Sequence, residues 1–369
     1  MRFLAVIILM LISLVTPSVF GADSVSVQVL QSNLNHPWSL AFLPGEQGIL
    51  ISERSGQLRR WHHGKLSAPI SGTPAVWAKK QGGLLDVALA PDFVSSRQLY
   101  LSYTESDDQG AVGAVVGRAT LSEDYRHLSD FRVLLRQTPK LSSGANLGTR
   151  LAFDPSGYLW ISFGDNFAAE KAQDLRALQG KILRLKADSA IPADNPFRGR
   201  SDARAEIWSD GMRNPQGLAW NPWSKVMWES EHGPRGGDEI NLPEKGKNYG
   251  WPLATWGIDY SGQPVPGSKG GRVSGTRQPL FYWKVSPALS GMAFYDSHRF
   301  PAWRHSLFIG ALKDRSLIRL SVDGNKVTEQ QRLLRDRGER IRDVRVGPDG
   351  YLYVLTDEAQ GKLLKVGLR

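Results

Sequence analysis

One pattern of apolar and polar positions recurs along the chain. A short apolar strand is followed by a turn rich in Pro, Asp or Gly and then by a second strand rich in aromatic or β-branched residues, as in residues 150–155 (RLAFDP) and 158–161 (YLWI). Patterns of this kind, closed by turn residues, indicate antiparallel β-strands rather than helices. The other copies begin at residues 38, 85, 217, 291 and 342.

The number and spacing of the copies predict the fold class. Six copies follow one another at intervals of roughly 45–75 residues. Each copy is too small to bury its own faces, but four-stranded units packed radially share one core and keep only short edges. We therefore predict an all-β six-bladed β-propeller with a central channel and long functional loops on one face. A pair of β-sandwiches is the alternative, but it does not predict one signature through the whole chain.

Two segments stand apart from the repeats. The longest interval contains residues 254–280, which are rich in Gly, Pro and Ser, and loops of this kind on a rigid scaffold often carry function. Helical signal is scarce, and a short helix is expected only within residues 168–179.

The first 22 residues predict a signal peptide. Arg2 precedes an apolar run of about 13 residues, and the small residues Gly21 and Ala22 follow, as in secretory leaders cleaved near that point. An uncleaved anchor is the alternative, but a membrane span needs about 20 apolar residues. We predict a single propeller domain over residues 23–369 that is periplasmic or secreted, with no stable membrane insertion.

Composition and charge narrow the function classes. The chain has 46 Lys and Arg against 36 Asp and Glu, a formal net charge of +10, and no Cys. The absence of Cys excludes disulfides, thiolate metal sites and a Cys nucleophile. The cations are scattered, and the densest run, 332–345, is interleaved with acids, so we expect no nucleic-acid partner. Some of these cations could instead face an acidic small molecule.

The most unusual run is residues 231–241 (EHGPRGGDEIN), followed by 247–252 (KNYGWP). Acidic side chains beside a Gly/Pro turn present carboxylate and carbonyl oxygens at close range, which are the ligands that Ca²⁺ prefers. The spacing is not that of an EF-hand loop. A calcium site and a tight structural turn are both compatible with this run.

Cations also stand at the entrances of two copies. Arg213 and Asn214 precede Pro215, where propeller strands face the channel; an ordinary turn with a solvated Arg is the alternative. Alternation puts Arg340 and Arg342 on one side of a strand. The two cations repel unless an anion lies between them, or unless they pair with Asp343 and Asp336. Lys313 is a lone Lys, a type that is usually solvated.

Taken together, these segments resemble the soluble quinoprotein sugar dehydrogenases, which bind pyrroloquinoline quinone (PQQ). The periplasmic PQQ-dependent aldose sugar dehydrogenase branch is the most similar, and the resemblance runs from about His36 to Lys365. The segments that carry it are 36–38 (HPW), 81–85 (QGGLL), 213–217 (RNPQG), 231–241, 248–252 (NYGWP) and 340–344 (RIRDV). The family fold is a six-bladed propeller, in agreement with the repeat count.

The resemblance implies roles for individual residues. The positions that match cofactor contacts are Gln81, Arg213, Asn214, Trp283, Lys313, Arg340 and Arg342. PQQ has three carboxylates, which a ring of Arg and Lys can bind. The carbonyls of Gly233 and Pro234 match those that hold Ca²⁺ against the cofactor, and Glu239 and the backbone of Tyr249 match a second, structural Ca²⁺ site. The implied reaction oxidises aldoses to lactones by hydride transfer to the quinone, with Arg213 and Ca²⁺ polarising the quinone carbonyl. The electron acceptor is unknown.

The sequence departs from the family pattern at the catalytic base. Asn146 stands where the family has a His that takes the proton from the sugar, and Thr149 replaces a Gly. An amide does not accept a proton near neutral pH, and loss of a general base commonly costs about 10²–10⁴ in rate. The leading hypothesis is a PQQ- and Ca²⁺-dependent sugar dehydrogenase, impaired by Asn146. The alternatives are a catalytically degenerate propeller that binds a sugar or another ligand, and a propeller of another kind, such as a Ca²⁺-dependent lactone hydrolase.

Overall fold

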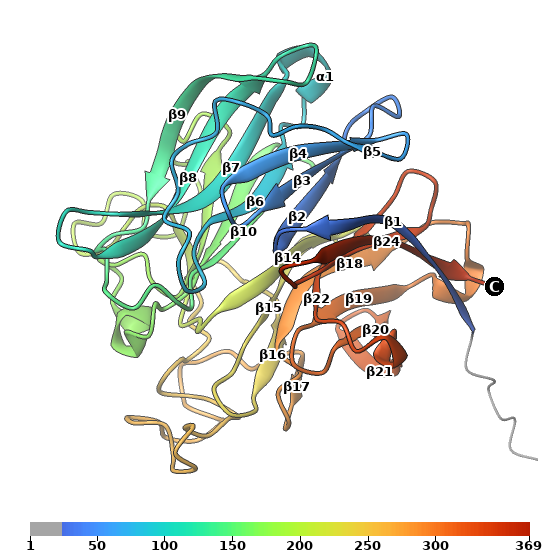
Figure 1. The fold of residues 1–369 in the computed structure, drawn as a ribbon. Coiled ribbons are helices and arrows are strands. Elements are labelled where there is room, and N and C mark those ends of the chain that lie inside the picture. Colours follow the sequence, from blue (N-terminus) through green and yellow to red (C-terminus); the bar gives the residue numbers. More distant parts are fainter. Residues whose placement is uncertain (1–23) are drawn as a thin grey trace, which may run out of the picture.

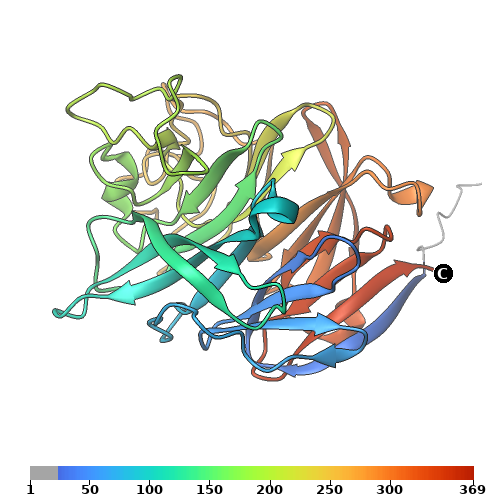
Figure 2. The same ribbon diagram turned by 90° about the horizontal axis from the view of Figure 1, so that it is seen from above.

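The computed structural model describes residues 24–369 and shows six antiparallel four-stranded sheets arranged in a ring (Figures 1 and 2). The innermost strand of each sheet contacts the innermost strands of both neighbouring sheets, so the ring is closed. The predicted six-bladed β-propeller is confirmed, and the sandwich alternative is wrong. The predicted signal peptide, residues 1–22, lies outside the described residues.

The blades follow one another along the chain, each from its inner to its outer strand. The first contains β2 (Pro37–Phe42), β3 (Ile49–Glu53), β4 (Gln57–His62) and β5 (Lys65–Leu66), and the second β6 (Leu84–Leu89), β7 (Gln98–Ser106), β8 (Val112–Leu121) and β9 (Leu128–Arg136). The third contains β10 (Gly148–Phe153), β11 (Tyr158–Phe163), β12 (Lys181–Lys186) and β13 (Ile207–Asp210), and the fourth β14 (Pro215–Asn221), β15 (Val226–Glu231), β16 (Asp238–Asn241) and β17 (Phe281–Trp283). The fifth contains β18 (Leu289–Tyr295), β19 (Ser306–Ala311), β20 (Ser316–Asp323) and β21 (Lys326–Leu333). The sixth contains β22 (Ile341–Val346), β23 (Leu352–Thr356) and β24 (Gly361–Leu368).

The outer strand of the sixth blade comes from the other end of the chain. Strand β1 (Val25–Leu34) pairs antiparallel with β24, from Val25 opposite Leu368 to Leu34 opposite Gly361. The last blade is therefore completed by the first strand, which ties the two ends of the ring together and covers the edge that β24 would otherwise expose. The sequence repeats did not reveal this strand, because they begin at residue 38.

Every inner strand carries one extra residue relative to its neighbour. The register shifts lie between Pro37 and Ser39, Leu84 and Val87, Gly148 and Leu151, Pro215 and Gly217, Leu289 and Met292, and Ile341 and Asp343. A β-bulge unpairs the extra residue and re-aims its side chain. Because all six bulges occur at the same level, they turn a ring of side chains into the channel.

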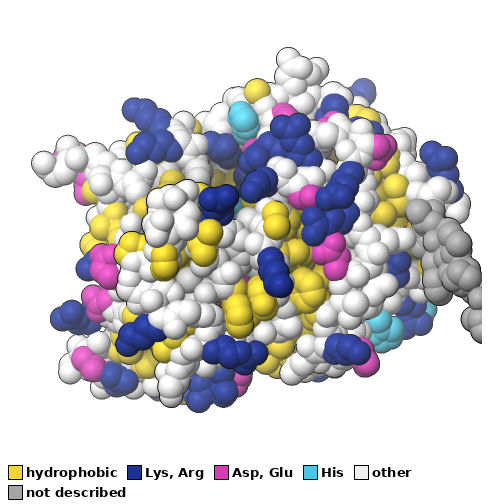
Figure 3. Space-filling model, turned by 90° about the horizontal axis from the view of Figure 1, so that it is seen from below, with side chains coloured by type: hydrophobic (Ala, Val, Ile, Leu, Met, Phe, Trp, Pro, Cys, Tyr) yellow, Lys and Arg dark blue, Asp and Glu magenta, His cyan; other side chains and the backbone are white. Residues whose placement is uncertain are grey.

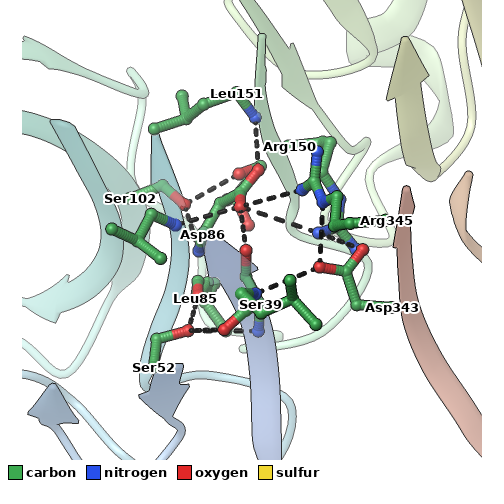
Figure 4. A network of polar contacts seen from close by, with 12 residues as sticks. Ser39, Ser52, Leu85, Asp86, Ser102, Arg150, Leu151, Asp343 and Arg345 are labelled. Carbon is green, nitrogen blue, oxygen red and sulfur yellow. Dashed lines mark hydrogen bonds and ion pairs between the residues drawn. The ribbon is translucent and has the colours of Figure 1, made fainter. Parts of the chain in front are cut away.

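A buried network of charges crosses the channel just beyond the bulges (Figure 4). Arg150 of the third blade is 1% exposed, and its Nη1 lies 3.1 Å from Oδ1 of Asp343 and 3.6 Å from Oδ1 of Asp86. Arg345 contacts the same two carboxylates at 3.2 Å and 3.5 Å. Two anions and two cations from three blades therefore balance, which is the condition under which buried charge is tolerated.

Neutral groups complete the network. Oδ2 of Asp86 accepts from the backbone N–H of Leu151 at 2.7 Å, and its Oδ1 accepts from the hydroxyl of Ser39. The guanidinium of Arg150 also lies 4.1 Å from the centre of the Trp38 ring. Gly291 leaves the space that the network needs, because a Cβ there would lie 2.0 Å from Oδ1 of Asp343.

Helical structure in the described part of the chain is limited to α1 (Phe93–Ser96) and the 3₁₀ turns η1 (Ala169–Gln173), η2 (Pro301–Trp303) and η3 (Arg335–Arg337). The helix expected within residues 168–179 is therefore only the single turn η1. The reason is a competing donor: Nζ of Lys181 donates to the carbonyls of Lys171, Ala172 and Gln179 at 2.8–2.9 Å. A buried ammonium satisfies these carbonyls in place of helical N–H groups.

The charge network predicts a large loss of stability on removal of one partner. We expect Arg150→Met to lower the free energy of unfolding by about 3–5 kcal/mol, because it leaves the carboxylates of Asp86 and Asp343 with one guanidinium between them. Urea unfolding followed by circular dichroism measures this loss. The control is Arg200→Ala, which removes an exposed pair with Asp202 and should leave the midpoint unchanged. Equal midpoints for the two variants would contradict the central role of the network.

Candidate active site in the channel mouth

The bulged ends of the inner strands open into a pocket of about 190 Å³ at one mouth of the channel. Four of the seven candidate cofactor residues line it, namely Gln81, Asn214, Arg340 and Arg342. Its wall also contains Trp38, Leu85 and Gln216, residues that the bulges turn inward. The structure therefore brings together residues from blades that are far apart in sequence.

Three guanidinium groups converge on one carboxylate in this pocket. The distances to the carboxylate of Asp357 are 2.6 Å from Arg342, 3.5 Å from Arg340 and 4.0 Å from Arg54. Burial alone would raise the pKa of Asp357, but the three nearby cations outweigh it and hold this pKa well below its usual range. Three cations share one anion, so the cluster keeps a net charge of about +2 and favours an anionic ligand.

The hydrogen bonding of the cluster is incomplete. Nε of Arg54 and Nε of Arg342 are buried and have no hydrogen-bond partner among the described residues. Buried donors without partners are rare in proteins and call for an explanation. A ligand that brings acceptor oxygens into the pocket is one.

Arg54 and Asp357 are functional candidates that sequence reasoning missed. It expected Arg342 to face an anionic ligand or to pair with Asp343 or Asp336, but Asp343 belongs to the charge network and the carboxylate at Arg342 is that of Asp357. The sequence signal that could have found them is their position. Each residue directly follows the second strand of its copy, after 49–53 (ILISE) and 352–356 (LYVLT). These strand ends point to the same mouth.

Side-chain amide groups also line the pocket. Oδ1 of Asn214 accepts from the backbone N–H of Gly148 at 3.2 Å, and Oε1 of Gln81 accepts from the backbone N–H of Asn146 at 2.8 Å. Nδ2 of Asn214 lies 3.4 Å from Nδ1 of His232. These contacts tie the loop that carries Asn146 to the second and fourth blades.

Asn146 lies behind the pocket wall and contacts a buried acid. Its Nδ2 donates to Oδ1 of Asp165 at 3.1 Å, while Nε1 of Trp251 donates to the other carboxylate oxygen at 2.8 Å. Burial raises the pKa of Asp165. Asn146 has a φ of 50°, a conformation that Asn tolerates, but Thr149 has a φ of 81°, which is strained for a β-branched residue.

The candidate calcium residues surround a small cavity of about 10 Å³, roughly the space that one water-sized sphere needs. Gly233, Glu239, Tyr249 and Arg213 line it. Nη1 of Arg213 donates to the carbonyl of Gly233 at 2.7 Å. Pro234, the other carbonyl expected to hold the metal, follows directly in the chain. The guanidinium therefore holds one of the oxygens expected to bind the metal.

Three buried glutamates lie on the adjacent strands β15 and β16. Burial raises the pKa of Glu231 to about 7, and burial followed by the charge of Glu231 raises the pKa values of Glu229 and Glu239. Oε1 of Glu229 has no hydrogen-bond partner among the described residues. Arg213 is the cation that acts on Glu231, and three buried carboxylates with so little positive charge beside them fit a hard cation, which oxygen ligands bind. In residues 24–369, no three acidic, His or Cys side chains already surround one metal position, so backbone carbonyls would have to complete the ligand set.

Two candidate cofactor residues lie elsewhere. Trp283 is 5% exposed within the hydrophobic core of the fourth and fifth blades, and its Nε1 donates to Glu329 at 2.6 Å. Lys313 is exposed and lines a neighbouring pocket. The structure does not bring either side chain into the pocket of the arginine cluster.

Sequence comparisons find similar proteins over almost the whole chain. A model of the family described as "Glucose / Sorbosone dehydrogenase" matches residues 34–365. The chain is 62% identical over 347 residues to aldose sugar dehydrogenase YliI of Escherichia coli (strain K12), covering 94% of both chains. It is 28% identical over 428 residues to quinoprotein glucose dehydrogenase B of Acinetobacter calcoaceticus, covering 93% of this chain and 88% of the relative.

Solved structures give the same result. The soluble aldose sugar dehydrogenase of Escherichia coli in the apo-form matches with a TM-score of 0.93 at 62% identity, covering 94% of this chain and 100% of that chain. The PQQ-bound aldose sugar dehydrogenase of Streptomyces coelicolor matches with a TM-score of 0.75 at 28% identity, covering 94% and 99%. The likeness extends over the whole propeller rather than over one blade.

The buried glutamates predict a pH dependence of stability. The pKa of Glu231 rises from 4.5 to about 7 on folding, so between these values the folded state binds a proton that the unfolded state has lost. Without divalent cations, the free energy of unfolding should therefore fall as the pH rises from 4.5 to 7, by on the order of a few kcal/mol. Thermal melts in a chelator across this range measure the fall.

Calcium and one substitution provide the controls. Added Ca²⁺ should restore stability at pH 7 and above, because it supplies the missing counter-charge. Glu231→Gln should flatten the pH profile, since the amide does not titrate. Stability that increases steadily from pH 4.5 to 7 in the chelated protein would contradict this account.

Proposed function

Because the chain belongs to the glucose/sorbosone dehydrogenase family and is a sugar dehydrogenase, we propose that it oxidises aldoses to lactones with PQQ and Ca²⁺. The observation that carries the proposal is the cluster of Arg54, Arg340 and Arg342 around the single carboxylate of Asp357. A net positive pocket with two buried guanidinium nitrogens still unpartnered fits a cofactor with several carboxylates.

Different residues of the pocket would bind different parts of PQQ. Arg340 and Arg342 would hold the acidic groups of PQQ, while Asn214 and Gln81 would orient its polar edge through their amides. When bound, PQQ supplies the two-electron acceptor for the hydride of the sugar. Arg213 would stabilise negative charge that develops beside it, since its guanidinium is buried and already points at the loop carbonyls.

The metal proposal rests on the oxygens next to Arg213. Gly233 and Pro234 would offer backbone carbonyls to a Ca²⁺ beside the cofactor, and Glu239 with the backbone of Tyr249 would hold a second, structural Ca²⁺. The buried and unneutralised carboxylates of β15 and β16 support a cation in this region.

Proton transfer is the step of the proposed reaction to which Asn146 is poorly suited. The amide of Asn146 can hydrogen-bond a sugar hydroxyl, but it cannot take the proton. Asp165 is 1% exposed, and Asn146 and Trp251 occupy its oxygens. We therefore propose that turnover is impaired. The same observation favours the second candidate, a propeller that binds a sugar or another ligand without oxidising it.

The proposal includes export. Residues 1–22 have the sequence of a signal peptide, which supports a periplasmic or secreted protein with one domain over residues 23–369. Among the described residues, no helix is long and apolar enough to cross a membrane. The electron acceptor is unidentified.

The arginine cluster predicts the affinity for PQQ. Arg342→Ala should weaken PQQ binding about ten- to a hundredfold, because a charge-assisted hydrogen bond contributes about 1.5–3 kcal/mol. Equilibrium titration of the apoprotein with PQQ in the presence of Ca²⁺ measures the change. Arg335→Ala is the matched control, since Arg335 is exposed and pairs with Asp314. A wild-type protein that binds no PQQ at micromolar concentration would refute the dehydrogenase proposal.

The missing base predicts a gain of function. Asn146→His should raise aldose-dependent dye reduction by about 10²-fold or more, with little change in PQQ affinity. His, like Asn, tolerates the positive φ of this position. Strain at Thr149 sets a limit to the gain, so Asn146→His combined with Thr149→Gly is the second variant to measure. Wild-type turnover as fast as that of either variant would show that another group takes the proton.

A further inference from the structure

A second pocket lies beside the channel mouth. It has a volume of about 490 Å³, and its wall includes Arg235, Trp256, Ile258, Lys284, Val285 and Lys313. This volume is in the range of sites that bind small molecules. The loop 254–280 forms one side of the pocket, and the chain just after β17 forms the other.

Three cations line this pocket without partners. The side chains of Arg235, Lys284 and Lys313 make no hydrogen bond or ion pair within residues 24–369, and no carboxylate is among the residues that line the pocket. On the face seen in Figure 3, Lys and Arg are scattered with Asp and Glu between them, and many surface cations are paired with acids. A concave site with three unpaired cations and no acid is therefore a site for an anion.

The backbone around the cations is firmly held. Arg235 and Ile258 exchange both backbone hydrogen bonds, at 2.9 and 3.1 Å. Gly236 has a φ of 80°, and a Cβ there would lie 2.3 Å from the carbonyl of Lys284. The glycine thus lets the strand end that carries Lys284 approach the loop that carries Arg235.

An aromatic wall adjoins the cations. The ring of Trp256 stacks on that of Tyr282 with centroids 4.4 Å apart and an angle of 10° between the planes. Stacking of this kind fixes the ring that lines the pocket. Gly271 also packs against this ring, since a Cβ there would lie 2.6 Å from Cδ2 of Trp256, so the tryptophan adds a rigid apolar wall beside the cations.

The pocket and the channel mouth are lined by residues that are close in the chain. Leu312 and Ala288 line the pocket of the arginine cluster, and their neighbours Lys313 and Ser286 line this one. The two segments are joined by the bond from the backbone N–H of Leu312 to the carbonyl of Ala288, at 2.8 Å. A ligand anchored here could extend towards the cofactor.

We propose that this pocket binds the acidic group of an anionic aldose, so that uronic acids or sugar phosphates are preferred over neutral sugars. The inference rests on the proposed function, which it deepens by naming the substrate class. Arg235 and Lys284 supply specificity and have no part in holding PQQ. Lys313 lines this pocket with them and adds a third positive charge.

The test compares three sugars on the full-length mature protein. Calorimetry gives the affinity for glucuronate, glucose 6-phosphate and glucose, with and without PQQ, and dye reduction gives kcat and KM for each. The two anionic arms distinguish a carboxylate from a phosphate. The variants are Arg235→Ala with Lys284→Ala together, and the control is Lys269→Ala, an exposed cation of the same loop that does not line the pocket.

We expect wild type to bind at least one anionic sugar about tenfold or more tightly than glucose, with an affinity that falls as salt is added. The double variant should lose this preference and keep its KM for glucose, and the control should behave as wild type. Equal affinities for the three sugars in wild type, or an unchanged preference in the double variant, would overturn the proposal and leave the cations to an acidic macromolecule. A preference that persists in calorimetry while no sugar is oxidised would refute the dehydrogenase proposal alone.

Discussion

The propeller depends on a balance of charge at its centre. Arg150 reaches from the third blade to the carboxylates of Asp86 and Asp343 in the second and sixth blades, and Arg345 closes the set. Arg150, Asp86 and Asp343 are almost inaccessible to water, whereas Arg345 is partly exposed, so removal of one of the three buried charges leaves another buried charge without a partner. Because the partners come from blades that are not all neighbours, the network fixes the relative position of inner strands that backbone hydrogen bonds alone would not join.

This central network also divides the channel into two unlike mouths. On one side the bulges open the cationic pocket of Arg340 and Arg342. On the other side lies a pocket of about 360 Å³ lined mainly by apolar residues, with an Ala at the same point of five inner strands and Arg345 at that point of the sixth. The pocket with several cations, which suits an anionic ligand, therefore lies on one face of the propeller. The same face carries the long loop 254–280. The six blades are similar, but the layer of buried charges lies across the channel between its two mouths. The two faces of the propeller therefore differ in the ligands that they can bind.

The sequence predicts the ring far better than it predicts the site. Each of the six strand–turn–strand signatures lies within a short segment. The blades can therefore be counted from the sequence without knowledge of contacts between distant residues. The closure of the ring by β1 is not local, because it pairs residues 25–34 with 361–368. In the same way, the sequence indicates that Arg342 needs an anion nearby, but it does not indicate that this anion is Asp357. Arg342 lies at the bulge of β22 and Asp357 follows the end of β23, and only the folded structure shows that these two positions meet. The helix expected within residues 168–179 is reduced to the turn η1 for a related reason. Lys181, which lies outside the segment, donates hydrogen bonds to its carbonyl groups.

Under the proposed function, Asn146 would let the site keep its shape while proton transfer is impaired. The buried carboxylate of Asp165 requires donors, and the amide of Asn146 supplies one at 3.1 Å, so the packing around the pocket is preserved. An imidazole in the same place could also donate to Asp165, and the carboxylate would raise its basicity by stabilising the charged ring. The amide satisfies the acid but cannot accept a proton near neutral pH. Thr149 also departs from the glycine expected at this position: its positive φ costs on the order of 1–3 kcal/mol that glycine would not incur, while its hydroxyl donates to the carbonyl of Gly148. Under the proposed function, a strained Thr149 beside an amide that cannot act as a base would preserve the packing of the loop while it slows proton transfer.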